Sequence, residues 1–437
     1  MNTKWISSLP ALALVLACLV CLCSAQGSGA RAQQLMQAYA DDGWFMGSVL
    51  IAQNGKVVLS KGYGWADAEW SIPNSPSTRF AIASITKEFT AASILLLEER
   101  GKLKTDDLVK KYLPEAPASW DKITIYNLLT HTSGIPDAGV EYQSGPPEKM
   151  VFHDKPLEFQ PGEKWAYSNQ GYVVLGYVLE RLSGQTYEDF IRDNIFKPLG
   201  MNDSGMDSNF TIIPRRASGY SPGENGIDNA ERIYRSAFAA GGIYSTTEDM
   251  LRWEEGLFGG KLLTPVSLRK MTTPVKSDWA CGLYVKNVNG HLMVEQSGGA
   301  IGFNGDVAYY PEEKLAVIVL GNLNTAGILK ITTALAEVMH GETITASLPK
   351  AIVLPKEVLE RYVGTYAFPD DDDFVVTLHG DHLVADYGGR YRLFPESETR
   401  FFIQWWDMDF EFSKNDKGEF AIVTQHFDGK ENKGQKK

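Results

Sequence analysis

The sequence predicts an α+β fold: an antiparallel sheet flanked by helices with a helical insertion, followed by a small C-terminal β-barrel. Strand-like runs lie at both ends of the region up to residue 340, and helix-like runs lie between them. Beyond Tyr362 the chain consists almost entirely of short strand candidates separated by turn signals. We therefore expect a signal peptide over 1–25, a large domain over 26–345, a linker over 346–361 and a barrel domain over 362–437.

The composition supports a folded, acidic protein. Of 437 residues, 44% are hydrophobic and 22% are charged, which is enough apolar material for full cores and excludes a mainly disordered chain. There are 42 basic and 54 acidic residues, for a net charge of −12 at pH 7. Nucleic acid and anionic membrane surfaces are therefore poor partners for this chain.

The N-terminus has the pattern of a secretory signal. Lys4 precedes an apolar run over residues 9–22 that is too short to span a bilayer well, and the small residue Ala25 suits cleavage. A weak lipobox around Cys18 offers the alternative of a lipid anchor, although we prefer simple cleavage. Either way the mature chain keeps only Cys281, so we expect an exported protein, periplasmic or extracellular, without an internal disulfide.

The elements of the large domain follow from their apolar spacing and end signals. Asn54-Gly55 favours the tight turn of a β-hairpin, Gly101 stops a helix, and the capping box Ser245-Thr246-Thr247-Glu248 begins another. The expected strands are Val49–Ala52, Val57–Ser60, Leu292–Gln296, Gly305–Tyr310 and Leu315–Leu320. The expected helices are Thr86–Gly101, Tyr172–Leu182, Asp249–Leu257 and Ile328–Met339.

The C-terminal strands are short and closely spaced, with turns such as Gly380-Asp381 between them. We expect the polar end Gly429–Lys437 to fray. The expected barrel strands are Phe374–Leu378, His382–Tyr387, Tyr391–Phe394, Phe401–Gln404, Phe410–Ser413 and Phe420–Gln425.

Ser84 and Lys87 are the first candidates for chemistry. Ser84 lies where a loop enters the predicted helix, and Lys87 lies one turn further on the same face. A serine hydroxyl needs a neighbouring base to become a nucleophile, and a lysine desolvated by apolar neighbours could supply it. Taken alone, the pattern is more typical of a capping serine beside a surface lysine.

Two further segments carry candidate side chains. Tyr167 and Asn169 are two apart in an extended stretch, so the phenol and the amide would face one cavity. The segment Gln296-Ser297-Gly298-Gly299 ends a predicted strand, where glycines let a substrate lie close and a backbone N–H can face an oxyanion. Alone, the first is typical of a helix cap and the second of a glycine-rich turn.

Together these segments resemble the S-x-x-K, Y-x-N and K-T-G or H-x-G motifs of the penicillin-binding protein and class C β-lactamase-related serine hydrolases, which include D-Ala-D-Ala carboxypeptidase B type peptidases. The resemblance covers about Leu35 to His340, and the tail resembles the lipocalin-like domain that often accompanies the family. Four further segments support it: Leu128–Pro136, Pro161-Gly162, Pro198–Met201 and Ala240–Thr246.

The resemblance implies a role for each candidate. Ser84 would be the acylated nucleophile, Lys87 would take its proton, and Tyr167 would serve as general base with Lys87 and then as acid to the leaving group. Asn169 would hold Lys87 and the substrate, and Gln296-Ser297-Gly298-Gly299 would line the substrate site. The N–H groups of Ser84 and Gly299 would form the oxyanion hole, with no metal and no organic cofactor.

One residue departs from the family pattern. Gln296 stands where members usually have Lys or His, a cation that helps to hold a substrate carboxylate. This departure puts strong β-lactamase or carboxypeptidase activity in doubt and leaves esterase or amide hydrolase activity open.

Other motifs favour structural interpretations. His131 is more typical of a turn cap than of a catalytic base, and the seven histidines show no paired spacing for zinc. The run Asp370–Asp373 could bind calcium but is more typical of a solvated loop, and the aromatic stretch around Trp405-Trp406 is more typical of a half-buried strand than of a sugar platform.

We therefore interpret the chain as an exported serine hydrolase that acts through an acyl-serine on small esters, amides or peptides, D-residue substrates included. The alternatives are a D,D-carboxypeptidase or β-lactamase, a β-lactam-binding protein without turnover, and an inactive scaffold. The sequence specifies neither the natural substrate nor the oligomeric state.

Overall fold

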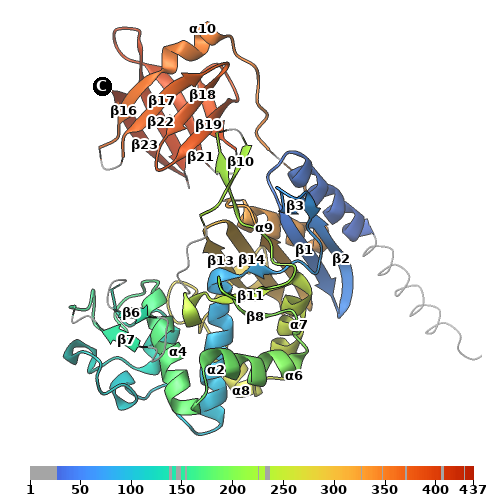
Figure 1. Cartoon of the computed structure of the whole chain (residues 1–437), viewed down its shortest axis with the longest axis vertical. Coiled ribbons are helices and arrows are strands. Elements are labelled where there is room, and N and C mark those ends of the chain that lie inside the picture. The colour runs from blue at the N-terminus through green and yellow to red at the C-terminus, as the bar shows by residue number, and fades with distance from the viewer. Residues whose placement is uncertain are drawn as a thin grey trace, which may run out of the picture.

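The computed structural model describes residues 27–437 except 137–139, 144–148, 153–154, 225, 232–236, 326, 347, 370–371, 405–407 and 428. The segment interpreted as a signal peptide, Cys18 included, lies outside the described residues, as do Trp405, Trp406 and part of the Asp370–Asp373 run. The predicted fold class is confirmed: a helix-flanked antiparallel sheet precedes a separate barrel (Figure 1).

The main sheet has six antiparallel strands in the order β12-β13-β14-β15-β1-β2, so the first and last strands of the domain meet at its centre. The predicted hairpin is present, with β1 and β2 joined at Asn54-Gly55. The strand bounds are β1 Gly47–Gln53, β2 Lys56–Tyr63, β12 Tyr284–Val288, β13 His291–Ala300, β14 Phe303–Tyr310 and β15 Leu315–Gly321.

Alternating residues of the central strands bury both faces of this sheet. Val49, Ile51 and Val317 pack against a helix over residues 27–41 and against α9 (Ile328–His340). Leu50 and Ile318 face the opposite way into a larger helical core. This two-sided burial explains why β15 is a continuous run of aliphatic residues.

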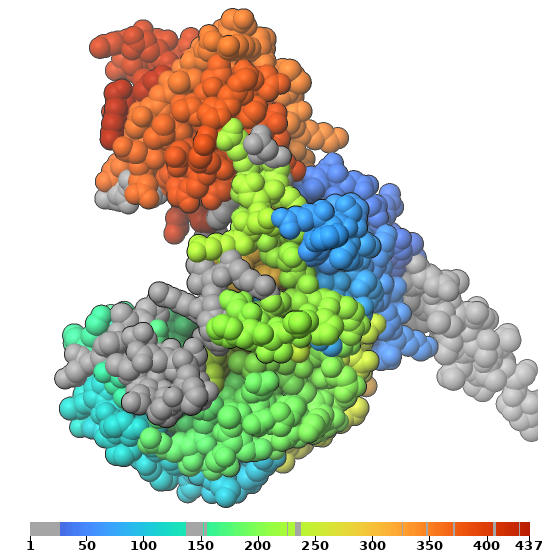
Figure 2. Space-filling view, viewed as in Figure 1, coloured from blue at the N-terminus to red at the C-terminus, as the bar shows by residue number. Residues whose placement is uncertain are grey.

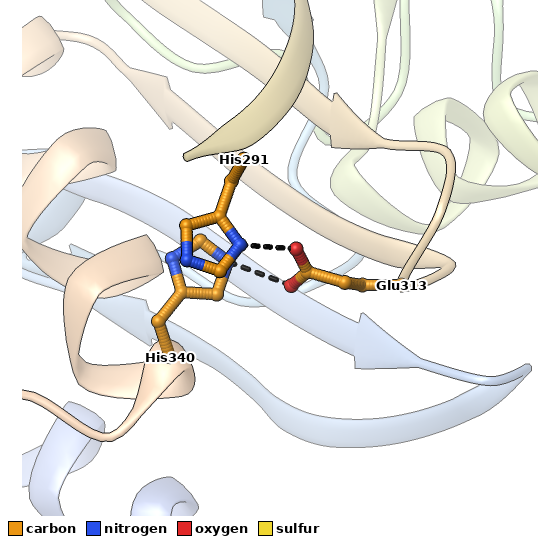
Figure 3. A group of neighbouring side chains, drawn as sticks. All are labelled: His291, Glu313 and His340. Carbon is orange, nitrogen blue, oxygen red and sulfur yellow. Dashed lines mark hydrogen bonds and ion pairs between the residues drawn. The ribbon is translucent and has the colours of Figure 1, made fainter. Parts of the chain in front are cut away.

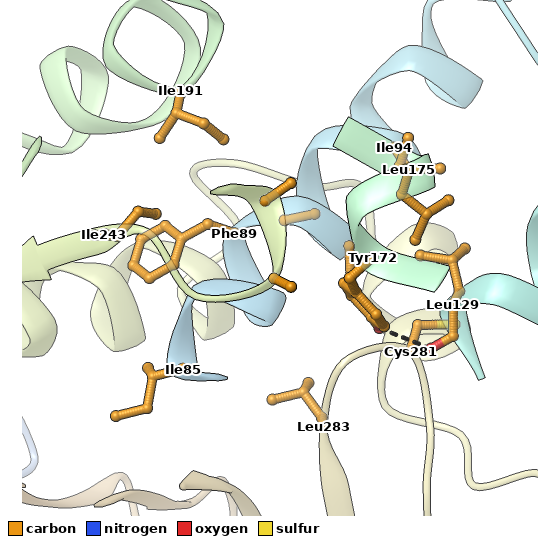
Figure 4. Close-up of a cluster of buried hydrophobic side chains, with 14 of the residues drawn as sticks. Ile85, Phe89, Ile94, Leu129, Tyr172, Leu175, Ile191, Ile243, Cys281 and Leu283 are labelled. Atoms are coloured by element: carbon orange, nitrogen blue, oxygen red, sulfur yellow. Dashed lines mark hydrogen bonds between the residues drawn. The ribbon is translucent and has the colours of Figure 1, made fainter. Parts of the chain in front are cut away.

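The larger core surrounds helix α2, most of whose length is buried. Phe89 stacks on Trp253 with ring centroids 4.1 Å apart. The Tyr172 hydroxyl donates to the Leu129 carbonyl at 2.7 Å (Figure 4). The helices of this region are α2 Thr86–Glu99, α3 Ile125–Leu129, α4 Asn169–Ser183, α5 Tyr187–Ile191, α6 Lys197–Leu199, α7 Thr247–Phe258 and α8 Pro265–Met271.

The cap of α7 differs from the expected one by a single residue. Thr246, and not Ser245, is the N-cap, and its side chain accepts a hydrogen bond from the Asp249 N–H. Ser245 ends strand β11 (Ile243–Ser245) and pairs with Phe80 of β5 (Phe80–Ala81). Strand pairing therefore keeps Ser245 extended and places the start of the helix one residue later.

The C-terminal part is a closed antiparallel barrel of eight strands. The expectation that residues 429–437 fray is wrong, because β23 pairs with both β22 and β16 and closes the barrel. The strand bounds are β16 Gly364–Ala367, β17 Phe374–His379, β18 His382–Asp386, β19 Arg390–Pro395, β20 Arg400–Ile403, β21 Met408–Lys414, β22 Phe420–Phe427 and β23 Lys430–Lys436. The segment expected as a linker contains α10 (Lys356–Leu359), and Leu359 belongs to the barrel core.

The two parts touch through the hairpin of β9 (Tyr220–Gly223) and β10 (Gly226–Asn229), which projects from the first part to the barrel (Figures 1 and 2). Glu224 at its tip lies 2.6 Å from His379 Nδ1 and 3.0 Å from an Arg390 nitrogen. Among the described residues, none of the helices combines the length and the apolar character needed to cross a bilayer.

Candidate active site

Ser84 lies in a single 3-10 turn, Ala83–Ile85, between β5 and α2. Ala83 has a φ of +45°, a conformation that side-chain-bearing residues rarely adopt, so the turn is strained. Strand β13 holds it closely: a Cβ at Gly298 would lie 2.2 Å from the Ile82 carbonyl oxygen and 3.0 Å from the Ser84 nitrogen. Only glycine lets β13 approach the serine this closely, while the Ser84 side chain stays partly exposed.

Lys87 lies one turn along, fully buried, and its ammonium nitrogen has three neighbours. Nζ is 3.0 Å from Ser84 Oγ, 2.8 Å from Asn169 Oδ1 and 2.6 Å from the Ala240 carbonyl oxygen. Burial lowers the pKa of Lys87 from 10.5 to about 7. A substantial fraction of Lys87 is therefore neutral at neutral pH.

The three contacts orient the neutral amine. The amide oxygen of Asn169 and the carbonyl of Ala240 can only accept hydrogen bonds, so they take the two N–H groups of an uncharged Lys87. Its lone pair then faces Ser84 Oγ. This is the geometry that a base needs to remove the serine proton.

Tyr167 approaches the serine from the other side, with its hydroxyl donating to Ser84 Oγ at 2.8 Å. Asn169 reaches Lys87 and Tyr167 reaches Ser84, so the phenol and the amide both contact the serine–lysine pair. Ser168 between them is the extended N-cap of α4, and its hydroxyl accepts from the Gly171 N–H.

His131 packs against Tyr167 and the start of α4. Its ring stacks on Tyr167 with centroids 4.6 Å apart, and its Nδ1 accepts from the Ser168 N–H at 3.0 Å. Burial and the nearby Lys87 charge lower the pKa of His131 to about 3, so the ring is neutral. The turn-capping interpretation agrees with this environment.

Gln296 contacts the backbone of the serine. Its side chain is only 2% exposed, and Nε2 donates to the Ser84 carbonyl oxygen at 3.1 Å. The next residue, Ser297, is exposed. Strand β12 pairs with β13 only as far as Glu295, so the segment Gln296–Gly299 has no β12 partner. Of the predicted binding residues in this segment, Ser297 and Gly299 are the exposed ones.

A cavity of about 750 Å³ adjoins the site. Ala81, Gly241 and Ala300 line it. In the sequence they lie close to the Ser84 turn, Ala240 and Gly299 respectively. Its described walls carry three carboxylates and one guanidinium, together with apolar side chains: Glu69, Asp207, Glu231, Arg216, Phe210, Ile212, Ile213, Ile301 and Phe303.

Three features of the site have no local sequence signal. The Ala240 carbonyl is 153 residues from Lys87, and the Gln296 amide is 212 residues from the carbonyl it binds. The third is a pair of buried glutamates, Glu88 of α2 and Glu254 of α7: Glu88 accepts from the Trp253 indole N–H at 2.5 Å, and its pKa is raised by burial and by the Glu254 charge.

Comparison with known proteins agrees with this geometry. The family described as Beta-lactamase matches residues 32–337, and a domain of unknown function, DUF3471, matches residues 348–436. Penicillin-binding protein 4* of Bacillus subtilis (strain 168) is 29% identical over 91% of this chain and 96% of its own length.

Solved structures give the same result. A penicillin binding protein from Bacillus halodurans is 29% identical with a TM-score of 0.62, covering 69% of this chain and 98% of that one. The octameric penicillin-binding protein homologue from Pyrococcus abyssi is 26% identical with a TM-score of 0.62, covering 93% and 99%. This chain therefore belongs to the β-lactamase family and is a serine hydrolase related to the penicillin-binding proteins.

Proposed function

We propose that this chain is an exported hydrolase that acts through an acyl-Ser84 intermediate on small esters, amides or peptides, D-residue substrates included. The observation that carries the proposal is the placement of Ser84 Oγ, 3.0 Å from a buried lysine nitrogen and 2.8 Å from a phenol hydroxyl. The proposed chemistry uses no metal and no organic cofactor.

In the acylation step, Ser84 Oγ attacks the substrate carbonyl carbon while its proton passes to the neutral amine of Lys87. The Tyr167 hydroxyl, 2.8 Å from Oγ, then delivers a proton to the leaving alcohol or amine and regains one from Lys87. Water then gives a proton to the same pair and attacks the acyl-serine, and Ser84 Oγ takes that proton as the bond breaks and the acid is released. Asn169 and the Ala240 carbonyl direct the lone pair of Lys87 at the serine whenever the amine is neutral.

The developing oxyanion would be stabilised by the N–H groups of Ser84 and Gly299. The close approach of Gly298 to the Ser84 nitrogen supports this assignment, because it puts the end of β13 beside the nucleophile's own N–H. Removal of one such donor typically costs 10²- to 10³-fold in rate.

The substrate class follows from the charges around the site. Gln296 is neutral and already binds the Ser84 carbonyl, and the described cavity wall carries more carboxylates than cations. A substrate with a free carboxylate would meet a net repulsive field there. We therefore propose uncharged short esters and amides as preferred substrates. The competing assignments are a D,D-carboxypeptidase or β-lactamase and a β-lactam-binding protein without turnover.

A panel of p-nitrophenyl esters, D-amino acid amides, a D-Ala-D-Ala peptide and nitrocefin tests the proposal. We expect turnover of the esters and amides, and loss of turnover and of fluorophosphonate labelling in Ser84→Ala. Labelling that persists in Ser84→Ala would refute the nucleophile. Faster turnover of nitrocefin or the D-Ala-D-Ala peptide than of the esters would favour the competing assignment, and labelling without turnover would favour a binding protein.

A further inference from the structure

His291, Glu313 and His340 meet at the edge of the molecule away from the serine. His291 begins β13, Glu313 lies in the turn between β14 and β15, and His340 ends α9. Figure 3 shows both imidazole rings turned toward the one carboxylate. His291 Nδ1 lies 2.5 Å from one carboxylate oxygen, and His340 Nε2 lies 2.8 Å from the other.

The arrangement is poorly explained as a simple ion pair. The two rings stack face to face, with centroids 3.7 Å apart and planes 3° apart, so two protonated imidazoles would repel each other strongly. His340 Nε2 is buried, and within the described part of the chain it has the close contact with Glu313 but no hydrogen bond. A buried ring nitrogen therefore faces a carboxylate without donating to it.

We propose that His291, Glu313 and His340 bind a divalent transition-metal ion, for which Zn²⁺ is the best match. Two imidazoles and a carboxylate are donors that Zn²⁺ prefers, and the three ligand atoms lie within 4.8 Å of one another. The charge of the carboxylate offsets part of the charge of the ion, and each neutral imidazole offers a lone pair.

The distances allow the ion to enter with small movements. Ligand atoms about 2.0–2.2 Å from a tetrahedral Zn²⁺ are roughly 3.3 Å apart, so the two nitrogen–oxygen pairs must each open by less than about 1 Å. The two parallel rings must also tilt so that both in-plane lone pairs point at the ion. His291 and Glu313 are 34% and 26% exposed in their side chains, which leaves room for that movement and for water as a fourth ligand.

The site is separate from the catalytic serine. Gly298 is seven positions after His291 in strand β13, which corresponds to roughly 23 Å along an extended strand. The ion would join a strand, a hairpin turn and the end of the helix after which the chain continues toward the barrel. Its role is therefore to hold these elements together, by binding the folded state and not the unfolded one.

Calorimetric titration of the full chain, first dialysed against a chelator, with ZnCl₂ tests the proposal. We expect one saturable site with a micromolar or tighter dissociation constant, a rise in melting temperature on binding, and a Co²⁺ absorption spectrum typical of tetrahedral coordination. Glu313→Gln and His291→Ala should each weaken binding by about 10²-fold or more and abolish the rise in melting temperature, because each removes one of three protein ligands.

His382→Gln is the matched control, since it removes a partly buried barrel histidine that contacts a single carboxylate, Asp381. It should bind Zn²⁺ as the native chain does. Fluorophosphonate labelling of Ser84 should be retained in all three variants and shows that each is folded. Absence of a saturable site in the native chain, or equal Zn²⁺ binding by Glu313→Gln and the native chain, would overturn the proposal.

Discussion

Replacing Asn169 by Asp should move the pH dependence of acylation upward. In the native chain the base is neutral Lys87, with a pKa of about 7, so the acylation rate should rise with pH and level off above pH 8. At pH 5 only about one molecule in a hundred carries the neutral amine, which predicts a roughly 100-fold lower rate. The sign follows from burial, which favours the uncharged form of lysine.

The magnitude of the change follows from one distance. The Asn169 Oδ1 atom is 2.8 Å from Lys87 Nζ. Two unit charges at that separation attract by about 1.5 kcal/mol at a dielectric constant of 80 and by about 6 kcal/mol at 20. The carboxylate of Asn169→Asp should therefore raise the pKa of Lys87 by about 1 to 4, which slows acylation at pH 7 by about 5-fold or more and restores it at higher pH.

The assay is the rate of labelling by an uncharged fluorophosphonate between pH 5 and 10.5, since it reports acylation without deacylation. Asn169→Ala is the matched control, because it removes the same acceptor without adding a charge and should not raise the midpoint. A midpoint that stays near 7 in Asn169→Asp would refute the assignment of Lys87 as the titrating base. Equal losses at every pH would mean that Asn169 positions the substrate and does not tune the lysine.

Three further results are expected. Gln296→Leu should slow hydrolysis of two matched substrates, one ester-capped and one with a free carboxylate, by the same factor of about 3 to 10, because it removes one hydrogen bond to the Ser84 backbone. A loss confined to the substrate with the free carboxylate would show that Gln296 binds that carboxylate. Glu254→Gln should raise the free energy of unfolding by roughly 2–5 kcal/mol at pH 8.5 but little at pH 5. Burial raises the pKa of Glu254 to about 8, so the native protein loses stability as the pH rises from 4.5 to 8. Equal effects of the substitution at both pH values in denaturant titrations would contradict this. A chain ending at Lys350 should fold and label at Ser84, because the core clusters of the first part contain no barrel residue; an insoluble or unlabelled product would show that the barrel is required.

Local periodicity predicted most of the elements but not every end. Helix α2 and strand β15 carry long apolar runs, so burial alone specifies them, and both lie where expected. Strand β23 has no such run, because its place in the barrel depends on main-chain hydrogen bonds to β22 and β16. Backbone pairing of this kind leaves little trace in side-chain polarity, so a polar closing strand could not be distinguished from a frayed end.

The candidate site shows the same division between local and distant contacts. Ser84 and Lys87 lie one helical turn apart, and Tyr167 and Asn169 flank a helix cap, so spacing alone could bring each pair together. Nothing local indicates that Gln296 would bind the Ser84 carbonyl or that Ala240 would accept from Lys87. The same holds for His291, Glu313 and His340, because their meeting depends on how β13 and α9 pack at the sheet edge.

The chemistry at Ser84 depends on these distant contacts more than on the motif. A lysine one turn from a serine on an exposed helix keeps a pKa near 10.4 and is almost fully protonated at pH 7. In this chain α4 and the turn before Gly241 cover Lys87, which lowers its pKa to about 7, and the Ala240 carbonyl takes one of its N–H groups. The spacing therefore places Lys87 close to Ser84, and the packing of the helical insertion against α2 lowers the lysine pKa so that it can act as the base. A substitution that opens this packing without touching Ser84 or Lys87 should raise the lysine pKa and slow acylation at neutral pH while leaving the rate at pH 10 nearly unchanged.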